Sequence, residues 1–256
     1  MKRTIFTATV FAMLALSTYA QQQADPEGDF AFDVIDNGRA VGITEYVGSN
    51  TDVRIPDRIQ NLPVTYIGDG AFERMRLTSV TIPDSVTHIG HAAFAWNELA
   101  SASIGKSVTH IGSSAFEDNW LTGIIIPDSV THINNRAFAN NQLTGVIIPS
   151  SVTHIIDGAF ANNRLTSVTI PDSVTHIDEW AFWDNRLTSV RIPDSVTHID
   201  HRAFARNPLT GVNIPDSVTH IGRRAFSESQ LTGVSVPSGA SIDPTAFDPS
   251  VTVTRR

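Results

Sequence analysis

Cysteine is absent from the 256-residue chain, which excludes disulfide bonds and an N-terminal cysteine that could carry a lipid. In an oxidising compartment, this absence also removes the hazard of misoxidation. Beyond the N-terminus, no apolar run is long enough to cross a membrane. Basic residues are few: 18 Lys and Arg stand against 26 Asp and Glu, for a formal net charge of −8. An acidic balance of this kind argues against nucleic acid as a partner.

Residues 1–20 have the features of a secretory signal peptide. Lys2 and Arg3 form a short positive region, an apolar core runs from Ile5 to Leu16, and small residues precede a cleavage site after Ala20. Residues 21–28 are polar and are predicted to be a flexible leader. The sequence therefore predicts an exported protein, and it leaves open whether that protein is secreted, held at the cell surface or periplasmic.

A repeat dominates the remainder of the chain. The stretch LTSVTIPDSVTHI begins at Leu77, and close copies begin at Leu121, Leu165 and Leu209. Leucines recur every 22 residues at Leu77, Leu99, Leu121, Leu143, Leu165, Leu187, Leu209 and Leu231. Phenylalanines keep the same period at Phe72, Phe94, Phe116, Phe138, Phe160, Phe182, Phe204 and Phe226. A fixed period of this length indicates a solenoid, in which each unit buries its apolar face against its neighbours.

Each position of the repeat has a predicted structural role. Leu77, Val80 and Ile82 alternate as a strand should, and Pro83 ends that strand. A second extended segment contains a valine and an isoleucine, after which the Ala-Phe pair turns the chain and stacks a phenylalanine spine. An asparagine lies two residues before the leucine in most units, at Asn97, Asn119, Asn141, Asn163, Asn185 and Asn207. A buried asparagine can satisfy backbone groups in the turn that no strand reaches.

The two ends of the repeat array differ from its middle. Residues 29–52 alternate around Asn37-Gly38, a dipeptide that favours a type I′ turn, and they predict a β-hairpin that caps the first coil. The solenoid is predicted over residues 53–253. Its last unit is degraded by Pro244 and Pro249, and residues 251–253 could form a closing strand.

The repeat resembles the BspA-like, or Treponema-type, leucine-rich repeat. That pattern, L-x-x-V-x-I-P-x-x-V-x-x-I-G-x-x-A-F, is matched from Leu77 to Phe94, and the resemblance covers residues 53–247. The glycine column departs from the pattern at Asn134, Ile156, Asp178 and Asp200, which suggests locally altered turns. The resemblance implies an α/β-class solenoid of mostly short parallel β-strands. It also implies a surface-exposed or secreted protein associated with adhesion to host matrix proteins and other cells, without a shared binding motif.

A column of histidines is the most conspicuous polar feature: His88, His110, His132, His154, His176, His198 and His220, with Tyr66 in the same place in the first coil. Stacked imidazoles could bind a transition metal or respond to pH. Alternatively, duplication copied an exposed residue without a role. A straight column is poorly suited to the tetrahedral geometry of zinc, so no metal or cofactor site is predicted.

The residue types of a hydrolase triad, Asp84, Ser85 and His88, recur in several units. They lie on one extended segment, whereas a triad needs side chains that converge on a pocket with an oxyanion hole. Repetition also argues against catalysis, because an enzyme needs one site. The chain is therefore predicted not to be an enzyme, and the aspartates after proline are expected to shape turns, with calcium binding as the alternative.

Positions that vary between units are not dictated by packing, so they are the candidates for binding a partner. The outward strand column contains Ile125, Ile147, Thr169, Arg191 and Asn213, with the two isoleucines adjacent on one sheet face. Tryptophans occupy variable turn positions at Trp96, Trp120, Trp180 and Trp183. The predicted partner is an extracellular or envelope protein or glycan, whereas the alternatives are a metal- or pH-responsive protein and a purely structural envelope protein. The oligomeric state is left open.

Overall fold

A computed structural model describes residues 23–256. The predicted signal peptide, residues 1–20, and the start of the leader lie outside the described residues. The described part contains two short 3-10 segments, η2 (Glu27–Asp29) and η3 (Asp36–Gly38), no α-helix, and 21 β-strands joined by turns. No helix in this part of the chain has the length and apolarity needed to cross a membrane.

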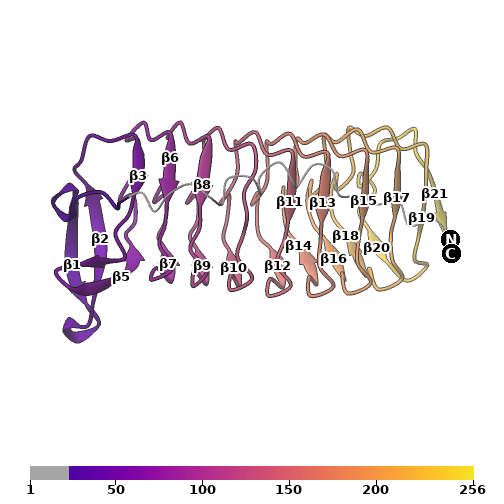
Figure 1. The fold of residues 1–256 in the computed structure, drawn as a ribbon. Coiled ribbons are helices and arrows are strands. Elements are labelled where there is room, and N and C mark those ends of the chain that lie inside the picture. The colour runs from indigo at the N-terminus through magenta and orange to yellow at the C-terminus, as the bar shows by residue number, and fades with distance from the viewer. Residues whose placement is uncertain (1–22) are drawn as a thin grey trace, which may run out of the picture.

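The coils stack in one array with two rows of parallel strands, one on either side of the proline (Figure 1). The first row comprises β3 (Asp52–Arg54), β6 (Ser79–Thr81), β8 (Ser101–Ser103), β11 (Gly145–Ile147), β13 (Ser167–Thr169), β15 (Ser189–Arg191), β17 (Gly211–Asn213), β19 (Gly233–Val236) and β21 (Thr252–Arg255). The second comprises β5 (Leu62–Ile67), β7 (His88–Ile89), β9 (His110–Ile111), β10 (His132–Ile133), β12 (His154–Ile155), β14 (His176–Ile177), β16 (His198–Ile199), β18 (His220–Ile221) and β20 (Ser241–Ile242). The predicted solenoid of short parallel strands is confirmed, and β21 closes the degenerate last repeat by pairing with β19.

A β-hairpin caps the N-terminal end, as predicted. Strands β1 (Phe30–Ile35) and β2 (Ala40–Tyr46) pair antiparallel, and β2 continues into the solenoid by pairing parallel with β5. The connection differs from the expected two-residue turn. Ile35 is opposite Ala40, so four residues bridge the strands, and Asp36, Asn37 and Gly38 all have positive φ. The first coil also holds a small hairpin, in which β4 (Arg58–Ile59) pairs antiparallel with β5.

The described end of the leader is anchored to the solenoid, although the sequence predicted flexibility there. The Asp25 carboxylate accepts hydrogen bonds from the backbone N–H of Arg54 and from the Asn50 amide, both at 2.6 Å. The Glu27 carboxylate accepts from the backbone N–H of Gln60 at 3.1 Å. These two carboxylates accept the hydrogen bonds that fix this segment, and the polar composition of the leader did not predict those bonds.

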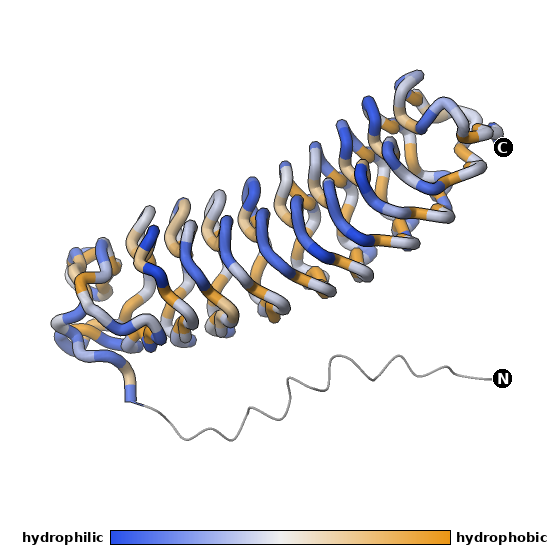
Figure 2. Tube along the Cα trace, turned by 90° about the horizontal axis from the view of Figure 1, so that it is seen from above, coloured by the Kyte–Doolittle hydropathy of each residue, from blue (hydrophilic) through white to orange (hydrophobic). Residues whose placement is uncertain are grey.

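A spine of aromatic rings runs through the interior. All eight phenylalanines from Phe72 to Phe226 are fully buried, with successive ring centroids 4.9–5.8 Å apart. At the N-terminal end, Tyr46 of the cap stacks on Phe72 at 5.4 Å, and Phe30 packs on Tyr46 at 5.5 Å. The hairpin therefore covers the first coil by extending the spine with its own rings. Hydrophobic and hydrophilic residues each recur at the same place in successive coils (Figure 2), and the apolar columns are buried inside the stack.

The asparagine column forms a buried ladder beside this spine, as expected. Asn97 accepts a hydrogen bond from the backbone N–H of Leu77 at 3.0 Å and donates to the carbonyl of Phe72 at 2.7 Å. It also donates to the carbonyl of Phe94 in its own coil at 3.0 Å. Each asparagine thus joins two coils through groups that the strands leave unpaired. The ladder continues to Asn207, and it ends there because Ser229, at the equivalent position, accepts from Leu231 two residues later, at 3.3 Å, and not from the preceding coil.

Both strand rows are interrupted, which corrects the prediction that the outward column lies on one sheet face. The first row does not pair between β13 and β15 or between β17 and β19, and both rows are interrupted near the middle. In the first row, residues 122–126 of the described chain form no strand, so β8 and β11 are separated by one coil. In the second row, β10 and β12 do not pair. No backbone hydrogen bond joins residues 131–134 to residues 153–156, both of which are described. We call this gap the seam.

We attribute the seam to Ile156. The column it occupies is glycine in several coils, and a Cβ added at Gly112 would lie 2.6 Å from the backbone of Gly90 in the preceding coil. Asn134 and Asp178 carry a Cβ there and keep their inter-coil hydrogen bonds at 3.1 and 2.9 Å. Isoleucine is branched at Cβ and stiffer, so the backbone of the preceding coil must move away. The seam opens only on the strand side, because Phe138 still donates to the carbonyl of Ala159 at 2.9 Å.

Candidate binding surfaces

Two exposed isoleucines lie beside the seam. Ile125 and Ile147 are 72% and 61% exposed, the highest values among the exposed large hydrophobic side chains of the described chain. They occupy the same position in adjacent coils, 22 residues apart. Together they form an apolar patch within a polar surface, which we call the isoleucine pair. Isolated exposed apolar residues need no explanation, but adjacent ones are a feature of interaction sites.

The rest of the predicted strand face is polar, exposed and divided. Thr169 lies directly opposite Ile147, and Asn213 lies opposite Arg191. Strands β13 and β15, which carry Thr169 and Arg191, do not pair with each other. Arg191 forms an ion pair of 3.5 Å with Asp172, and both side chains are about three-quarters exposed. An ion pair so open to water contributes little to stability, so Arg191 is available to a partner.

The four tryptophans separate into two pairs. Trp96 and Trp120 line one open depression of about 540 Å³, 42% and 51% exposed respectively. Trp180 and Trp183 lie several coils away, on the turn that contains Phe182. Trp180 contacts His201 edge-on at 5.3 Å, and the half-buried Trp183 has the Arg206 guanidinium over its ring at 5.4 Å. The tryptophans, which the sequence offered together as candidates for partner binding, therefore lie on two separate surfaces.

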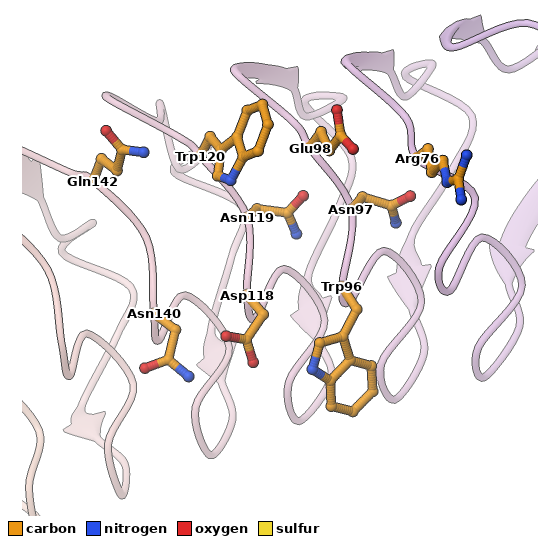
Figure 3. Close-up of a pocket in the computed structure, with 9 residues that line it drawn as sticks. All are labelled: Arg76, Trp96, Asn97, Glu98, Asp118, Asn119, Trp120, Asn140 and Gln142. Carbon is orange, nitrogen blue, oxygen red and sulfur yellow. The ribbon is translucent and has the colours of Figure 1, made fainter.

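The depression, which we call the tryptophan groove, lies between two rims (Figure 3). The upper rim comprises Arg76, Glu98, Trp120 and Gln142, and the lower rim comprises Trp96, Asp118 and Asn140. The floor is formed by Asn97 and Asn119, both buried. Their amides are committed to backbone groups of the ladder, so recognition in the groove would depend on the rims.

The residues of the lower rim have a left-handed backbone conformation. Trp96, Asp118 and Asn140 have φ of 53°, 54° and 55°, a region that costs a non-glycine residue about 1–2 kcal/mol. Every coil repeats this conformation, at Arg74, Trp96, Asp118, Asn140, Asn162, Asp184, Arg206 and Glu228. Each of these turns also donates an N–H to the next coil, as Trp96 does to the carbonyl of Glu117 at 3.0 Å. Stacking therefore maintains a backbone shape that sequence propensity disfavours.

The histidine column is a stack of parallel rings in two blocks. Ring centroids lie 4.5 Å apart from His88 to His110 and 4.6 Å apart from His110 to His132, with planes within 10°. A second block begins at His154, beyond the seam, and Tyr66 ends the first, as predicted. Burial, followed by the neighbouring imidazoles, lowers the pKa of His110. The same causes lower the pKa of His176, although Asp200 opposes them.

Threonine hydroxyls link these rings to the preceding coil. The hydroxyl oxygen of Thr109 lies 3.2 Å from the backbone carbonyl of Thr87 and 2.8 Å from Nδ1 of His110. The hydroxyl has one proton, so it can donate to only one of these two atoms, and the contact with Nδ1 is the shorter. The same arrangement recurs at His88, His132, His176 and His198.

This geometry is unfavourable for a shared metal. Two zinc–nitrogen bonds join nitrogens at most about 4.2 Å apart, and only when both lone pairs point at the ion. Parallel rings at 4.5–4.6 Å direct their lone pairs side by side. In the described part of the chain, no group of three or more histidine or acidic side chains is placed to hold a metal ion.

The triad residues do not come together as a catalytic unit. The Nδ1 atom of His88 is bonded to the hydroxyl of Thr87 at 2.9 Å, and the buried hydroxyl of Ser85 has no hydrogen-bond partner. In later coils the equivalent serine donates across the stack, as Ser173 does to the carbonyl of Val152 at 2.6 Å. Asp84 accepts from the backbone N–H of Lys106 at 2.8 Å. These residues serve the turns and the stacking of coils.

The sequence model of the BspA-type leucine-rich repeat region matches residues 46–144 and 131–254, in six copies. The chain belongs to this family. Among solved structures, this BspA-type protein is similar to a leucine-rich cell surface protein from Faecalibacterium prausnitzii, at 30% identity and a TM-score of 0.72. That match covers 93% of this chain and 77% of the other. A leucine-rich repeat protein from Bacteroides ovatus, 22% identical with a TM-score of 0.63, shares the fold, covering 92% and 72%. A comparison with curated proteins gave no match.

Membership gives this BspA-type protein a repeat scaffold, and the matched residues are those that build its core and turns. The exposed positions differ between its coils, so the family pattern does not specify them. Sequence reasoning found the isoleucine pair and the tryptophans, but it did not bring Trp96 and Trp120 to one groove. Trp96 directly precedes Asn97, and Trp120 directly follows Asn119, so the two rims come from the columns on either side of the asparagine column. The repeat shows this relation once the asparagines are known to be buried.

Proposed function

We propose that this BspA-type protein is an exported, non-enzymatic recognition protein that binds a protein partner through the isoleucine pair, as in adhesion to a matrix protein or to another cell. The observation that carries the proposal is the exposure of Ile125 and Ile147 on adjacent coils. Burying two such side chains under a partner is worth roughly 1.5–3 kcal/mol each. Thr169 and Arg191 supply a polar rim to this apolar centre, the usual anatomy of an interface.

Export is part of this proposal. It is supported by the character of residues 1–20 and by the similarity to a cell surface protein. Mass spectrometry of the protein recovered from its natural host tests it, since a mature N-terminus at Gln21 is expected. A protein that retains Met1 and fractionates with the cytoplasm would contradict export without affecting the binding surface.

A double substitution, Ile125→Ser with Ile147→Ser, tests the binding surface. Biolayer interferometry against purified matrix proteins and envelope fractions should show loss of at least about tenfold in affinity, because about 1.4 kcal/mol corresponds to that factor. Thr81→Ala is the matched control, since Thr81 occupies the same column in another coil. Unchanged binding by the isoleucine variant, with an unchanged Tm, would show that the surface is wrong.

A further inference from the structure

The tryptophan groove differs chemically from the isoleucine pair. Its rims contain no aliphatic side chain: every one ends in a planar group, whether indole, guanidinium, carboxylate or amide. A protein hot spot is typically a dry apolar centre from which water is excluded. This groove is open and has polar groups on both rims, so a dry apolar centre does not form there (Figure 3).

Planar polar groups next to exposed indoles suit one class of ligand. A sugar ring presents apolar C–H bonds on its faces and hydroxyl groups around its edge. The faces stack on aromatic rings, whereas amide, carboxylate and guanidinium groups form paired in-plane hydrogen bonds with neighbouring hydroxyls. Trp120 supplies the most exposed ring, and Gln142 and Glu98 flank it on the same rim.

One tryptophan is held in place before any ligand arrives. The Arg74 guanidinium lies 4.5 Å from the centroid of the Trp96 ring, and such contacts contribute about 0.5–1 kcal/mol at exposed sites. The backbone of Trp96 is bonded to the next coil at 3.0 Å. A ring positioned in this way loses little conformational freedom when a ligand binds, which favours affinity.

The charges of the rims further limit the class of sugar that can bind. Glu98 and Asp118 are acidic, and Arg76 is the basic member of the groove lining. A net negative rim repels sulfated or uronic-acid sugars and accepts hydroxyl or acetamido donors. We infer that the tryptophan groove is a binding site for a neutral oligosaccharide, stacked on Trp120 and Trp96 and hydrogen-bonded by the polar rims. This inference is independent of protein binding at the isoleucine pair.

A glycan array of neutral β-linked glucose, galactose, mannose and N-acetylhexosamine oligosaccharides, with heparin and polyuronate fragments as anionic comparators, tests the inference on the whole mature chain. Neutral oligosaccharides are expected to bind, and the anionic fragments are expected to be rejected. Calorimetry with the strongest neutral oligosaccharide should then show at least about a tenfold loss for Trp120→Ala, and a smaller loss for Gln142→Ala. Both variants should keep the wild-type Tm, because these side chains are not in the core.

Trp180→Ala is the matched control, since Trp180 is a partly exposed tryptophan outside the groove. It should bind sugar normally, as should the double isoleucine variant. Array signals confined to the anionic fragments, no signal from any oligosaccharide, or equal binding by Trp120→Ala would each overturn the proposal. The proposal would also be overturned if the Trp120→Ala variant lost binding to a protein partner but still bound oligosaccharides normally. If only the isoleucine variant loses protein binding, that result concerns the proposed function. It says nothing against the oligosaccharide site in the tryptophan groove.

Discussion

All the coils near the seam follow the same 22-residue repeat. The two coils that meet at the seam nevertheless stack differently from the coils on either side. From β12 to β16, successive coils share strand pairs, stacked imidazoles and backbone hydrogen bonds. Between β10 and β12 the described chain has none of these, whereas the phenylalanine spine and asparagine ladder continue. The comparison separates two sets of inter-coil contacts: the strand rows can open locally, while the spine side holds the stack together.

We attribute this difference to one position. Ile156 places a β-branched side chain where Gly112 brings two backbones into close contact. Repeat proteins have stabilities that are approximately sums of unit and interface terms, so one weak interface can divide the array. The isoleucine pair lies next to this interface, and the coil of Ile125 has lost its strand.

The largest effect is expected when the spine is cut at the seam. Phe138→Ala removes a fully buried ring and should lower the free energy of unfolding by about 3–5 kcal/mol. Because the second strand row does not pair across the seam, this interface depends mainly on the spine side, so the two halves should also unfold separately in urea. Phe204→Ala is the matched control, because the second strand row is unbroken on both sides of its coil, and it should lower stability in a single transition. A single transition of equal midpoint for both variants would mean that the seam does not divide the array.

Acid should weaken the histidine blocks. The pKa values of His110 and His176 lie below the ordinary value of about 6.5, so the unfolded chain binds protons first as the pH falls. The stability that these groups contribute is therefore present above about pH 6.5 and is lost as the pH decreases below it. His88 and His132 face His110, whereas His154, His198 and Asp200 face His176, and only the aspartate opposes the loss.

Urea titrations from pH 8 to pH 5 measure this loss. A His110→Gln, His176→Gln variant should show a shallower decline in the free energy of unfolding than the parent chain. His91→Gln is the control, because His91 is exposed and lies outside the two blocks. Parallel pH profiles for the double variant and the parent would show that stacking of the imidazoles does not set the acid sensitivity.

The smallest effect is expected from repairing the seam. Ile156→Gly restores the residue type that allows close approach, so the N–H of residue 156 should reach the carbonyl of Ile133. Hydrogen exchange of residues 153–156 should slow to the rate of the equivalent residues 175–178, with a change in global stability below about 1 kcal/mol because glycine loses more backbone entropy. Unchanged exchange would assign the seam to a cause other than Ile156.

The periodicity predicted most of the fold because each repeated residue has the same neighbours in every coil. The leucine and phenylalanine columns were recognised as core, and the asparagine column as a partner for buried backbone, from spacing alone. The seam was not predicted, although Ile156 was visible as a departure. Deciding its effect required the distance between two backbones, which a pattern does not contain.

Residue spacing was enough to predict the solenoid, its cap and the exposed positions, because a strict repeat gives each apolar column the same buried place in every coil. Which exposed residues meet was visible only in the folded structure. It placed Trp96 and Trp120 on opposite rims of one groove and Trp180 on another surface. It also placed the hydroxyl of Thr109 between Nδ1 of His110 and a carbonyl of the preceding coil. These relations depend on distances between coils, and residue spacing along the chain does not contain those distances.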